Sequence, residues 1–384
     1  MSVRVETSHD HMLIKFDECT YVLSHPDIFS VEHASYPGAE EIRGRRGVQL
    51  IDGAPHRRLH TFLTGYFAAR VDEFRASVLG PLVAAAIDEC AEKSELEVLG
   101  NFAAPLSLRV IAAVLGLPHE DPEFIAALAE WRDTMTPWVA TQGESSKERD
   151  LAMAAASRLR EAANPTIRIR KAAPRGDLVS ALWSVGPTIF PDWNDEDILD
   201  QCLIMLLAGG DGVARLISTT IHLAMDAPRL RLEIAQNRQI TAALIEHACR
   251  LYPPAQLRSR IAGCSATIGT REVRSGDRIG LDVVQANRDP ARFPPGGPIT
   301  GHHLAFNIGA RYCSGAPLAR AEAEEAVAAF FHAFPHCERL DRAPPPEFQG
   351  LLFLGFSPVH VRPHPAGAPG AEWSAKQRRP GERG

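Results

Sequence analysis

The longest apolar segment of the chain sets the strongest limit on its fold. Residues 194–225 read NDEDILDQCLIMLLAGGDGVARLISTTIHLAM and contain no proline. The segment opens on an Asn/Asp cluster that suits a helix N-cap, and Gly209, Gly210 and Gly212 stand in its middle. These features predict one long buried helix with a loosened centre.

Other helices are expected around it, because alanine- and leucine-rich segments with helical periodicity recur from residue 66 to residue 260. A helix over 241–252 should end before Pro253 and Pro254. Two strand-like runs flank Ser275-Gly276-Asp277, and a further helix is expected over 317–334. The sequence therefore predicts a mainly α fold with a minor β part.

Composition limits the class of protein. The chain has 384 residues, 45% of them hydrophobic, and a net charge of −6, which fits a soluble globular protein with a large core. Its length suggests two or three domains, but no linker or repeat interrupts it before about residue 364. We therefore expect one domain over 1–364 and a disordered basic tail over 365–384.

Several functions are excluded at this stage. The N-terminus lacks a secretory signal and no apolar run is long and continuous enough to span a membrane, so we predict a cytoplasmic protein without a membrane partner. The acidity is mild and spread out, which gives no nucleic-acid footprint. Seven irregularly spaced cysteines without a CxxC pair exclude a zinc ribbon and argue against a disulfide framework.

One cysteine has informative neighbours. The stretch FNIGARYCSGAPLAR, residues 306–320, reads FxxGxRxCxG and leads into a helix. The unpaired amides at that helix start favour an anion, so Cys313 should sit readily as a thiolate, which is a nucleophile or a metal ligand. Gly309 and Gly315 leave room for a flat ligand, and Arg311 would face the anionic edge of that ligand.

The stretch HLAFNIGARYCSGAPLARAE resembles the cysteine-ligand loop of the cytochromes P450, haem-thiolate oxygenases of the soluble bacterial kind. The resemblance covers roughly residues 12 to 362. It implies a triangular helical prism with small β-sheets, a haem b cofactor, and Cys313 as the fifth ligand of the haem iron. It also implies a set of cofactor-binding residues: His56, His60, Arg260, Phe306, Gly309, Arg311, Cys313 and Gly315.

Four of these residues should surround the haem propionates. His56, Arg260 and Arg311 correspond to the family's propionate partners, and His60 stands where the family usually has arginine. A buried dicarboxylate needs paired cations, so their convergence is physically coherent. Taken singly, either histidine is more readily interpreted as a surface or capping residue.

The sequence departs from the family where oxygen is activated. The family usually carries Ala-Gly-x-Asp/Glu-Thr in its long helix, and this chain has Asp211 followed by Gly212 in place of threonine. The predicted catalytic positions are therefore Asp211 and Gly212. Without the threonine hydroxyl, protons would be delivered by water or by the substrate's own hydroxyl, or no group would deliver them. Alternatively, Asp211 is a structural residue paired with Arg215.

A second departure concerns the family's Glu-x-x-Arg pair. His247 replaces the glutamate, Arg250 keeps the arginine position, and only Arg292 could stand in for the arginine that completes the network. We expect a rebuilt network in which Arg250 bonds backbone carbonyls and His247 stays neutral.

The resemblance further implies a substrate pocket and an electron donor. Its walls would come from residues 30–53, the centre of the long helix, the strand start near residue 257, and residues 350–356. Candidate apolar contacts, each of which taken singly is more readily interpreted as plain core, are Leu207, Val213, Leu257, Leu352 and Phe353. Because the glycines remove volume above the iron, we expect a bulky or aromatic substrate. Arg57 and Arg58 could receive an acidic ferredoxin, supplied by a ferredoxin reductase.

The resulting hypothesis is an iron-containing oxidoreductase, a monooxygenase or oxidase of secondary metabolite biosynthesis. It would hydroxylate a small organic molecule, or couple or cyclise an aromatic one, and peroxide-driven turnover stays open. The alternative is a non-catalytic P450-like scaffold that stabilises a partner biosynthetic enzyme, which the altered positions favour and the intact cysteine loop opposes.

Overall fold

A computed structural model provides the structure of the chain. It describes residues 9–31, 40, 42, 44–141, 145–294, 302–340 and 343–364. The predicted tail over 365–384 and part of the coil before the cysteine loop lie outside the described residues, and so do residues 32–39, 41 and 43 of the predicted pocket wall 30–53.

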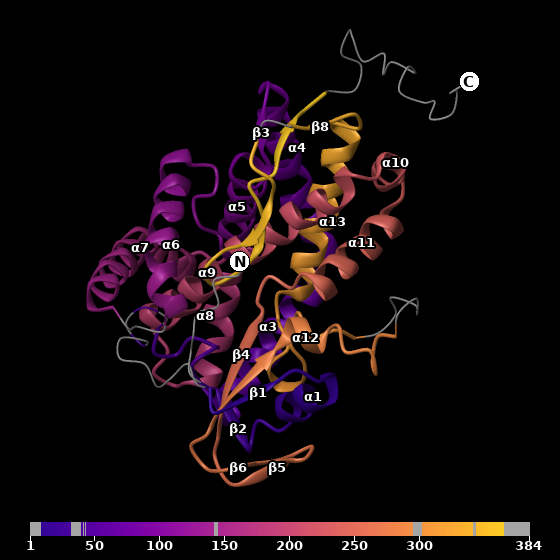
Figure 1. Cartoon of the computed structure of the whole chain (residues 1–384). Coiled ribbons are helices and arrows are strands. Elements are labelled where there is room, and N and C mark those ends of the chain that lie inside the picture. Colours follow the sequence, from indigo (N-terminus) through magenta and orange to yellow (C-terminus); the bar gives the residue numbers. More distant parts are fainter. Residues whose placement is uncertain are drawn as a thin grey trace.

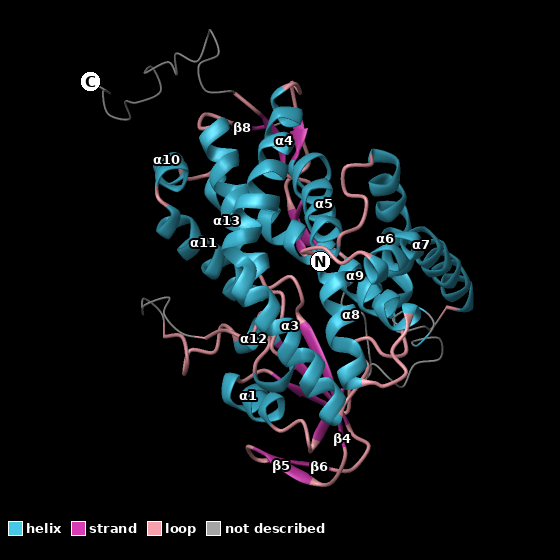
Figure 2. Ribbon diagram, turned by 180° about the vertical axis from the view of Figure 1, so that it is seen from behind, coloured by secondary structure: helices cyan, strands magenta, loops and turns pink. Residues whose placement is uncertain are grey.

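Helices form most of the molecule, as predicted (Figures 1 and 2). The α-helices are α1 (Phe16–Ser24), α3 (Gly53–Phe74), α4 (Gly80–Ala91), α5 (Ala104–Leu115), α6 (Pro122–Thr141), α7 (Ser146–Ala172), α8 (Leu178–Ile189), α9 (Asp195–Met225), α10 (Pro228–Gln236), α11 (Arg238–Leu251), α12 (Val283–Ala286) and α13 (Ala316–Ala333). The π-helical turns η2 (Arg75–Leu79) and η3 (Leu99–Ala103) lead into α4 and α5, and the 3-10 turn η4 (Gly309–Arg311) lies in the cysteine loop.

The strands form four small sheets. They are β1 (His11–Leu13), β2 (Phe29–Val31), β3 (Leu96–Glu97), β4 (Leu257–Ala262), β5 (Ala266–Ile268), β6 (Arg271–Val273), β7 (Arg278–Asp282), β8 (Glu338–Arg339), β9 (Glu347–Gln349), β10 (Gly355–Ser357) and β11 (His360–Arg362). The largest sheet has the order β1-β7-β4-β2 and lies beside α1 in the lower part of Figure 1. In its central pair, Arg258 lies opposite Leu281 and Arg260 opposite Ile279.

Helix α9 runs through the centre of the helical part (Figure 1). It is long and apolar enough to span a membrane by composition, but 67% of its most apolar window is buried within the protein, which is typical of a core helix. The predicted loosened centre is wrong, because the α-helix continues without a break through Gly209, Gly210 and Gly212. A Cβ atom on Gly209 would lie 3.2 Å from Ile111, so this glycine allows α5 to pack closely on α9.

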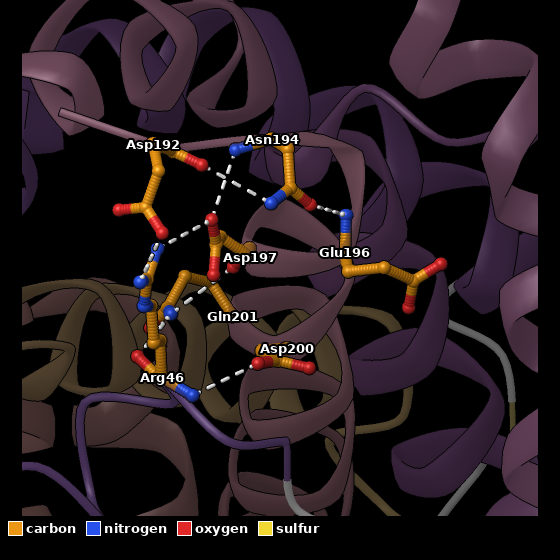
Figure 3. A network of polar contacts seen from close by, with 7 residues as sticks. All are labelled: Arg46, Asp192, Asn194, Glu196, Asp197, Asp200 and Gln201. Atoms are coloured by element: carbon orange, nitrogen blue, oxygen red, sulfur yellow. Dashed lines mark hydrogen bonds and ion pairs between the residues drawn. The ribbon is translucent and has the colours of Figure 1, made fainter. Parts of the chain in front are cut away.

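The start of α9 also anchors the segment that leads into α3 (Figure 3). Asn194 accepts a hydrogen bond from the amide of Glu196, and Asp197 accepts one from the amide of Asn194, which forms a capping box. Arg46 donates to Asp197 at 3.1 Å, and its own amide donates to Asp200 at 2.9 Å. The backbone entering residues 48–52 is therefore fixed against the first turns of the central helix.

Candidate functional site

A cavity of about 1450 Å³ lies between α9, α13, α3 and β4. Ordinary small-molecule sites measure about 300–1,000 Å³, so this one has room for more than one ligand. Most of the residues singled out from the sequence line it: His56, His60, Leu207, Gly212, Val213, Leu257, Arg260, Phe306, Arg311, Cys313, Gly315, Leu352 and Phe353. Gly309 and Asp211 do not line the cavity.

Cys313 is exposed to this cavity at the end of the loop that precedes α13. Its amide donates to the carbonyl of Phe306 at 2.8 Å, and its carbonyl accepts from the amide of Ala316 at 3.1 Å. Gly309 acts through the backbone, since its φ of +65° is strained for other residues and a Cβ there would lie 3.2 Å from the carbonyl of Leu23. The loop is thus shaped by its turns and seated on α1.

The helix start alone does not make Cys313 a thiolate. Burial raises the pKa of this thiol, although the amides of Gly315 and Ala316 and the charges of Arg258 and Arg320 lower it. Burial is the largest of these effects, so the protein by itself favours the thiol. The charge of a metal ion deprotonates a coordinating thiol outright, which makes metal ligation the condition for a thiolate here.

Two of the cations predicted for the propionates are held by the protein itself. Arg311 donates through Nη1 to the carbonyl of Val48 at 3.1 Å and through Nη2 to that of Ile51 at 2.7 Å, and it pairs with Asp52. His60 contacts the carbonyl of Tyr312 through Nε2 at 2.6 Å. Both side chains therefore tie the cysteine loop to α3 and to the segment before it.

The other two predicted cations face the cavity more freely. Arg260 is 5% exposed and donates to the carbonyl of Ser259 at 2.8 Å, while burial and the neighbouring Arg258 and Arg311 lower its pKa to about 10. His56 is also buried, and burial together with the charge of Arg311 lowers its pKa to about 4. His56 is therefore neutral near pH 7 until an anion comes close.

A network of charged residues surrounds the cysteine loop on its α11 side. Arg320 forms two hydrogen bonds to Glu246, of 2.6 Å and 3.2 Å, and donates to the hydroxyl of Tyr312 at 3.1 Å. His303 contacts Glu246 at 3.1 Å. The guanidinium of Arg320 also lies 4.3 Å from the ring centre of Phe306. The acid that the sequence lacks at position 247 is thus supplied next to it, at position 246.

The expected Glu-x-x-Arg residues take other roles. Arg250 donates to the carbonyl of Asn287 at 3.1 Å, and burial lowers the pKa of His247, in line with a backbone-bonded arginine beside a neutral histidine. Arg292 does not join Glu246; its guanidinium lies over the rings of Phe16 and Phe293.

The centre of α9 faces the cavity with apolar atoms. The α9 residues in the cavity wall are Ile204, Met205, Leu207, Ala208, Gly209, Gly212, Val213 and Leu216, none of which carries a hydroxyl or a carboxyl group. Asp211 instead pairs with Arg215, which contacts both carboxylate oxygens at 2.9 Å and 3.0 Å. Opposite Gly212, the ring of Phe353 lies 3.6 Å from where a Cβ atom would stand.

Three charged residues of the site escaped the sequence interpretation. Arg258 could have been found from its place two residues before Arg260, since alternate strand residues share a face. Glu246 precedes the expected acid position by one residue. Glu322, which is 2% exposed, lines the cavity and accepts a hydrogen bond from Ser107 at 2.5 Å. Nothing in its alanine-rich sequence distinguishes it from Glu324 and Glu325 of the same helix, which are half-buried and pair with Arg75.

No family model matches the chain. A crystal structure of Mycobacterium smegmatis CYP164A2 with econazole bound is 30% identical and superposes with a TM-score of 0.74, covering 91% of this chain and 90% of that one. The chain belongs to the cytochrome P450 superfamily. The Bacillus subtilis biotin biosynthesis cytochrome P450 is 28% identical over 294 residues, which are 74% of this chain and 72% of the relative.

A second curated relative, the 6-deoxyerythronolide B hydroxylase of Saccharopolyspora erythraea, is 25% identical over 341 residues, covering 83% of this chain and 81% of the relative. The chain is therefore an oxidoreductase of the monooxygenase type, and its cofactor is haem. P450s of this kind act on small molecules and receive electrons from a redox partner.

The cavity of this P450 fits such a cofactor. A cysteine thiol faces the cavity, the guanidinium of Arg260 is buried in its wall, and the volume exceeds that of an ordinary ligand site. The described residues hold no group of three or more His, Cys, Asp or Glu side chains arranged for a bare metal ion. A metal bound at Cys313 therefore needs a macrocycle to complete its coordination.

Proposed function

We propose that this P450 binds haem b through Cys313 and oxidises a bulky or aromatic small molecule in bacterial specialised metabolism, using dioxygen and electrons from a ferredoxin. The observation that carries the proposal is the position of Cys313, exposed to a cavity whose α9 wall is apolar. We place the enzyme in the cytoplasm, with residues 1–364 as one haem-binding domain.

The bound haem would supply dioxygen activation, and the remaining chemistry depends on the chain. Phe306, Cys313 and Gly315 line the part of the cavity next to α13, and Arg260 and His56 face it as candidates for the propionates. Leu207, Val213, Leu257, Leu352 and Phe353 would hold an apolar substrate and exclude water. Gly212 leaves room for this substrate beside Phe353.

The missing hydroxyl at position 212 supports chemistry in which the substrate or water carries protons. Since the α9 residues in the cavity wall have no acid or hydroxyl and Asp211 is paired with Arg215, proton delivery by Asp211 stays a prediction. A phenolic substrate could supply its own proton and lose an electron, which leads to coupling or ring closure. With proton delivery by water, the same site would give hydroxylation.

The electron donor is proposed on charge. Arg57 and Arg58 are exposed on α3 and directly follow His56, which faces the cavity. Exposed cations next to the haem site suit an acidic ferredoxin, and the association would weaken at high salt. The altered Glu-x-x-Arg residues were an argument for a non-catalytic scaffold. Glu246 and Arg320 form an ion pair in that region, which weakens this argument.

The test uses 2-naphthol as a probe, with a ferredoxin and its reductase as electron source. Hydroxylation adds one oxygen atom to the probe, whereas coupling joins two molecules with loss of two hydrogens, so mass spectrometry separates the products. Gly212→Thr restores the hydroxyl, and Gly212→Ala controls for added bulk, since a Cβ atom there makes only an ordinary contact with Phe353.

Loss or redirection of the coupled product in Gly212→Thr, with Gly212→Ala close to wild type, would support substrate-borne protons. More hydroxylated product per electron in Gly212→Thr would show that the native site is a hydroxylase with a defective relay. Absence of any haem-dependent oxidation by all three proteins, across this and other aromatic probes, would overturn the proposed function.

A further inference from the structure

Strand β4 carries two arginines toward the same cavity. Arg258 and Arg260 are alternate residues of this strand, so their side chains leave it on one face, and both line the cavity. Arg258 donates through Nη2 to the carbonyl of Ala305 at 3.1 Å, and its Nη1 contacts two carbonyls of its own segment at 3.3 Å. The carbonyl of Ala305 directly precedes the cysteine loop.

Arg258 and Arg260 form no ion pair with a carboxylate of the described residues, unlike three other arginines near the site. Arg311 pairs with Asp52, Arg320 with Glu246, and Arg215 with Asp211. Two titratable groups interact electrostatically with Arg258. They are the sulfur of Cys313 and the guanidinium of Arg260, whose positive charge repels that of Arg258.

Two neighbouring guanidiniums in a protein wall cost free energy unless an anion joins them. The described residues around Arg258 offer carbonyl oxygens, which satisfy donors but do not neutralise charge. Apart from the sulfur of Cys313, which the proposed site assigns to the haem iron, the described residues around Arg258 supply no negative charge, so the remaining source is a molecule in the cavity. Its position between two forked donors fits a carboxylate, which arginine binds through two parallel hydrogen bonds.

The other basic side chains of the site already have partners within the protein, so they do not take the place of Arg258 as a partner of this carboxylate. The Nη hydrogens of Arg311 are directed at Val48, Gln49, Ile51 and Asp52. His60 uses Nε2 on the carbonyl of Tyr312 and stands where an arginine was expected. The structure thus has one guanidinium fewer than expected on the α3 side of the cavity and one more on the β4 side.

We propose that Arg258 binds a haem propionate together with Arg260 and takes the place of the guanidinium that position 60 lacks. This inference rests on the proposed haem site. A carboxylate on the substrate has the same chemistry as a propionate, so the experiment separates the two sources.

The measurement is the rate of haem transfer from the holoenzyme to excess apomyoglobin. Arg258→Met removes the charge and keeps an apolar stem of similar length. Loss of a charge-assisted hydrogen-bonded pair predicts roughly tenfold to hundredfold faster haem loss. The matched control is Arg288→Met, an exposed arginine of the cavity rim that bonds the carbonyl of Leu251 and should stay within about twofold of wild type.

Arg258→Lys separates charge from structure. A carboxylate partner predicts that the lysine variant retains haem better than the methionine variant, because the charge is kept. Arg258→Gln keeps N–H donors for the carbonyl of Ala305 but carries no charge, so a role limited to carbonyl contacts predicts that it retains haem as well as Arg258→Lys, which would overturn the proposal. Should Arg258→Met not fold, the comparison of Arg258→Gln with Arg258→Lys remains.

A second arm tests the substrate as the source of the carboxylate, through the binding of 4-phenylbutyrate and of 4-phenylbutanol, followed by the shift of the haem absorption band. We expect Arg258→Met to change the affinity for both compounds to the same extent. Unchanged haem loss with a selective loss of phenylbutyrate binding would assign Arg258 to the substrate and refute the propionate role. Wild-type protein that binds no haem would instead refute the proposed function itself.

Discussion

The buried carboxyl group of Glu322 should make the stability of this enzyme fall as the pH rises. Glu322 lies on α13, is 2% exposed, and accepts a hydrogen bond from Ser107. Burial raises its pKa from 4.5 to about 8, and the hydrogen bond opposes this only in part. No cation balances it among the described residues, so the folded protein holds the protonated acid at neutral pH.

The sign and size of the effect follow from linkage. Below pH 4.5 both the folded and the unfolded chain bind this proton, so the group is then at its most favourable for folding. Between 4.5 and about 8 the unfolded chain releases the proton while the folded chain keeps it, and above that range both are ionised. At roughly 1.4 kcal/mol per pH unit, the loss of stability across the whole range is about 5 kcal/mol.

Glu322→Gln replaces the acid by a neutral group of the same shape that still accepts from Ser107. Urea unfolding at pH 5.5 and pH 8 should show the wild type losing about 3 kcal/mol more than this variant over the interval. Glu92→Gln, an exposed acid at the end of α4, should leave the wild-type pH dependence unchanged. Parallel pH profiles for wild type and Glu322→Gln would refute the assignment of a protonated buried acid.

Two further substitutions test the contacts that hold the cysteine loop. Arg320→Met removes the two hydrogen bonds from Arg320 to Glu246 and leaves this carboxylate only its contact with His303. It should lower the melting temperature by several degrees and speed haem loss, with Arg320→Lys recovering part of both. Calorimetry that finds the variants equal to wild type would contradict this role. His60→Phe leaves the carbonyl of Tyr312 without its donor and should lower the free energy of unfolding in urea by about 1 kcal/mol. His60→Gln keeps an N–H and should lower it less. Equal losses of stability for both would show that ring packing, and not the hydrogen bond, matters.

The sequence predicted the fold well where local signals agree with packing. The Asn/Asp cluster predicted the start of α9, and the two prolines that follow α11 predicted its end. The glycines of α9 were expected to loosen the helix, because glycine has a low helix propensity. The structure shows a continuous helix there, since close packing of Ile111 on Gly209 compensates for the low helix propensity of glycine.

The site was predictable in its residues but only partly in their contacts. A motif identifies Arg311 and His60, but it does not reveal that backbone carbonyls of residues 48–52 and 312 occupy their donors. Such contacts depend on the tertiary path of the chain, and so does the charge balance that distinguishes Arg258. The same is true of the pKa of Cys313, for which burial outweighs the helix start that the sequence showed.

The central claim is that Cys313 provides a thiolate to a haem iron. The most direct test is the absorption spectrum of the purified protein, reduced and exposed to carbon monoxide, beside that of Cys313→Ala. We predict a strongly red-shifted Soret band in the wild type that vanishes in the variant. A wild-type protein without haem, or with a band typical of nitrogen ligation, would contradict the account.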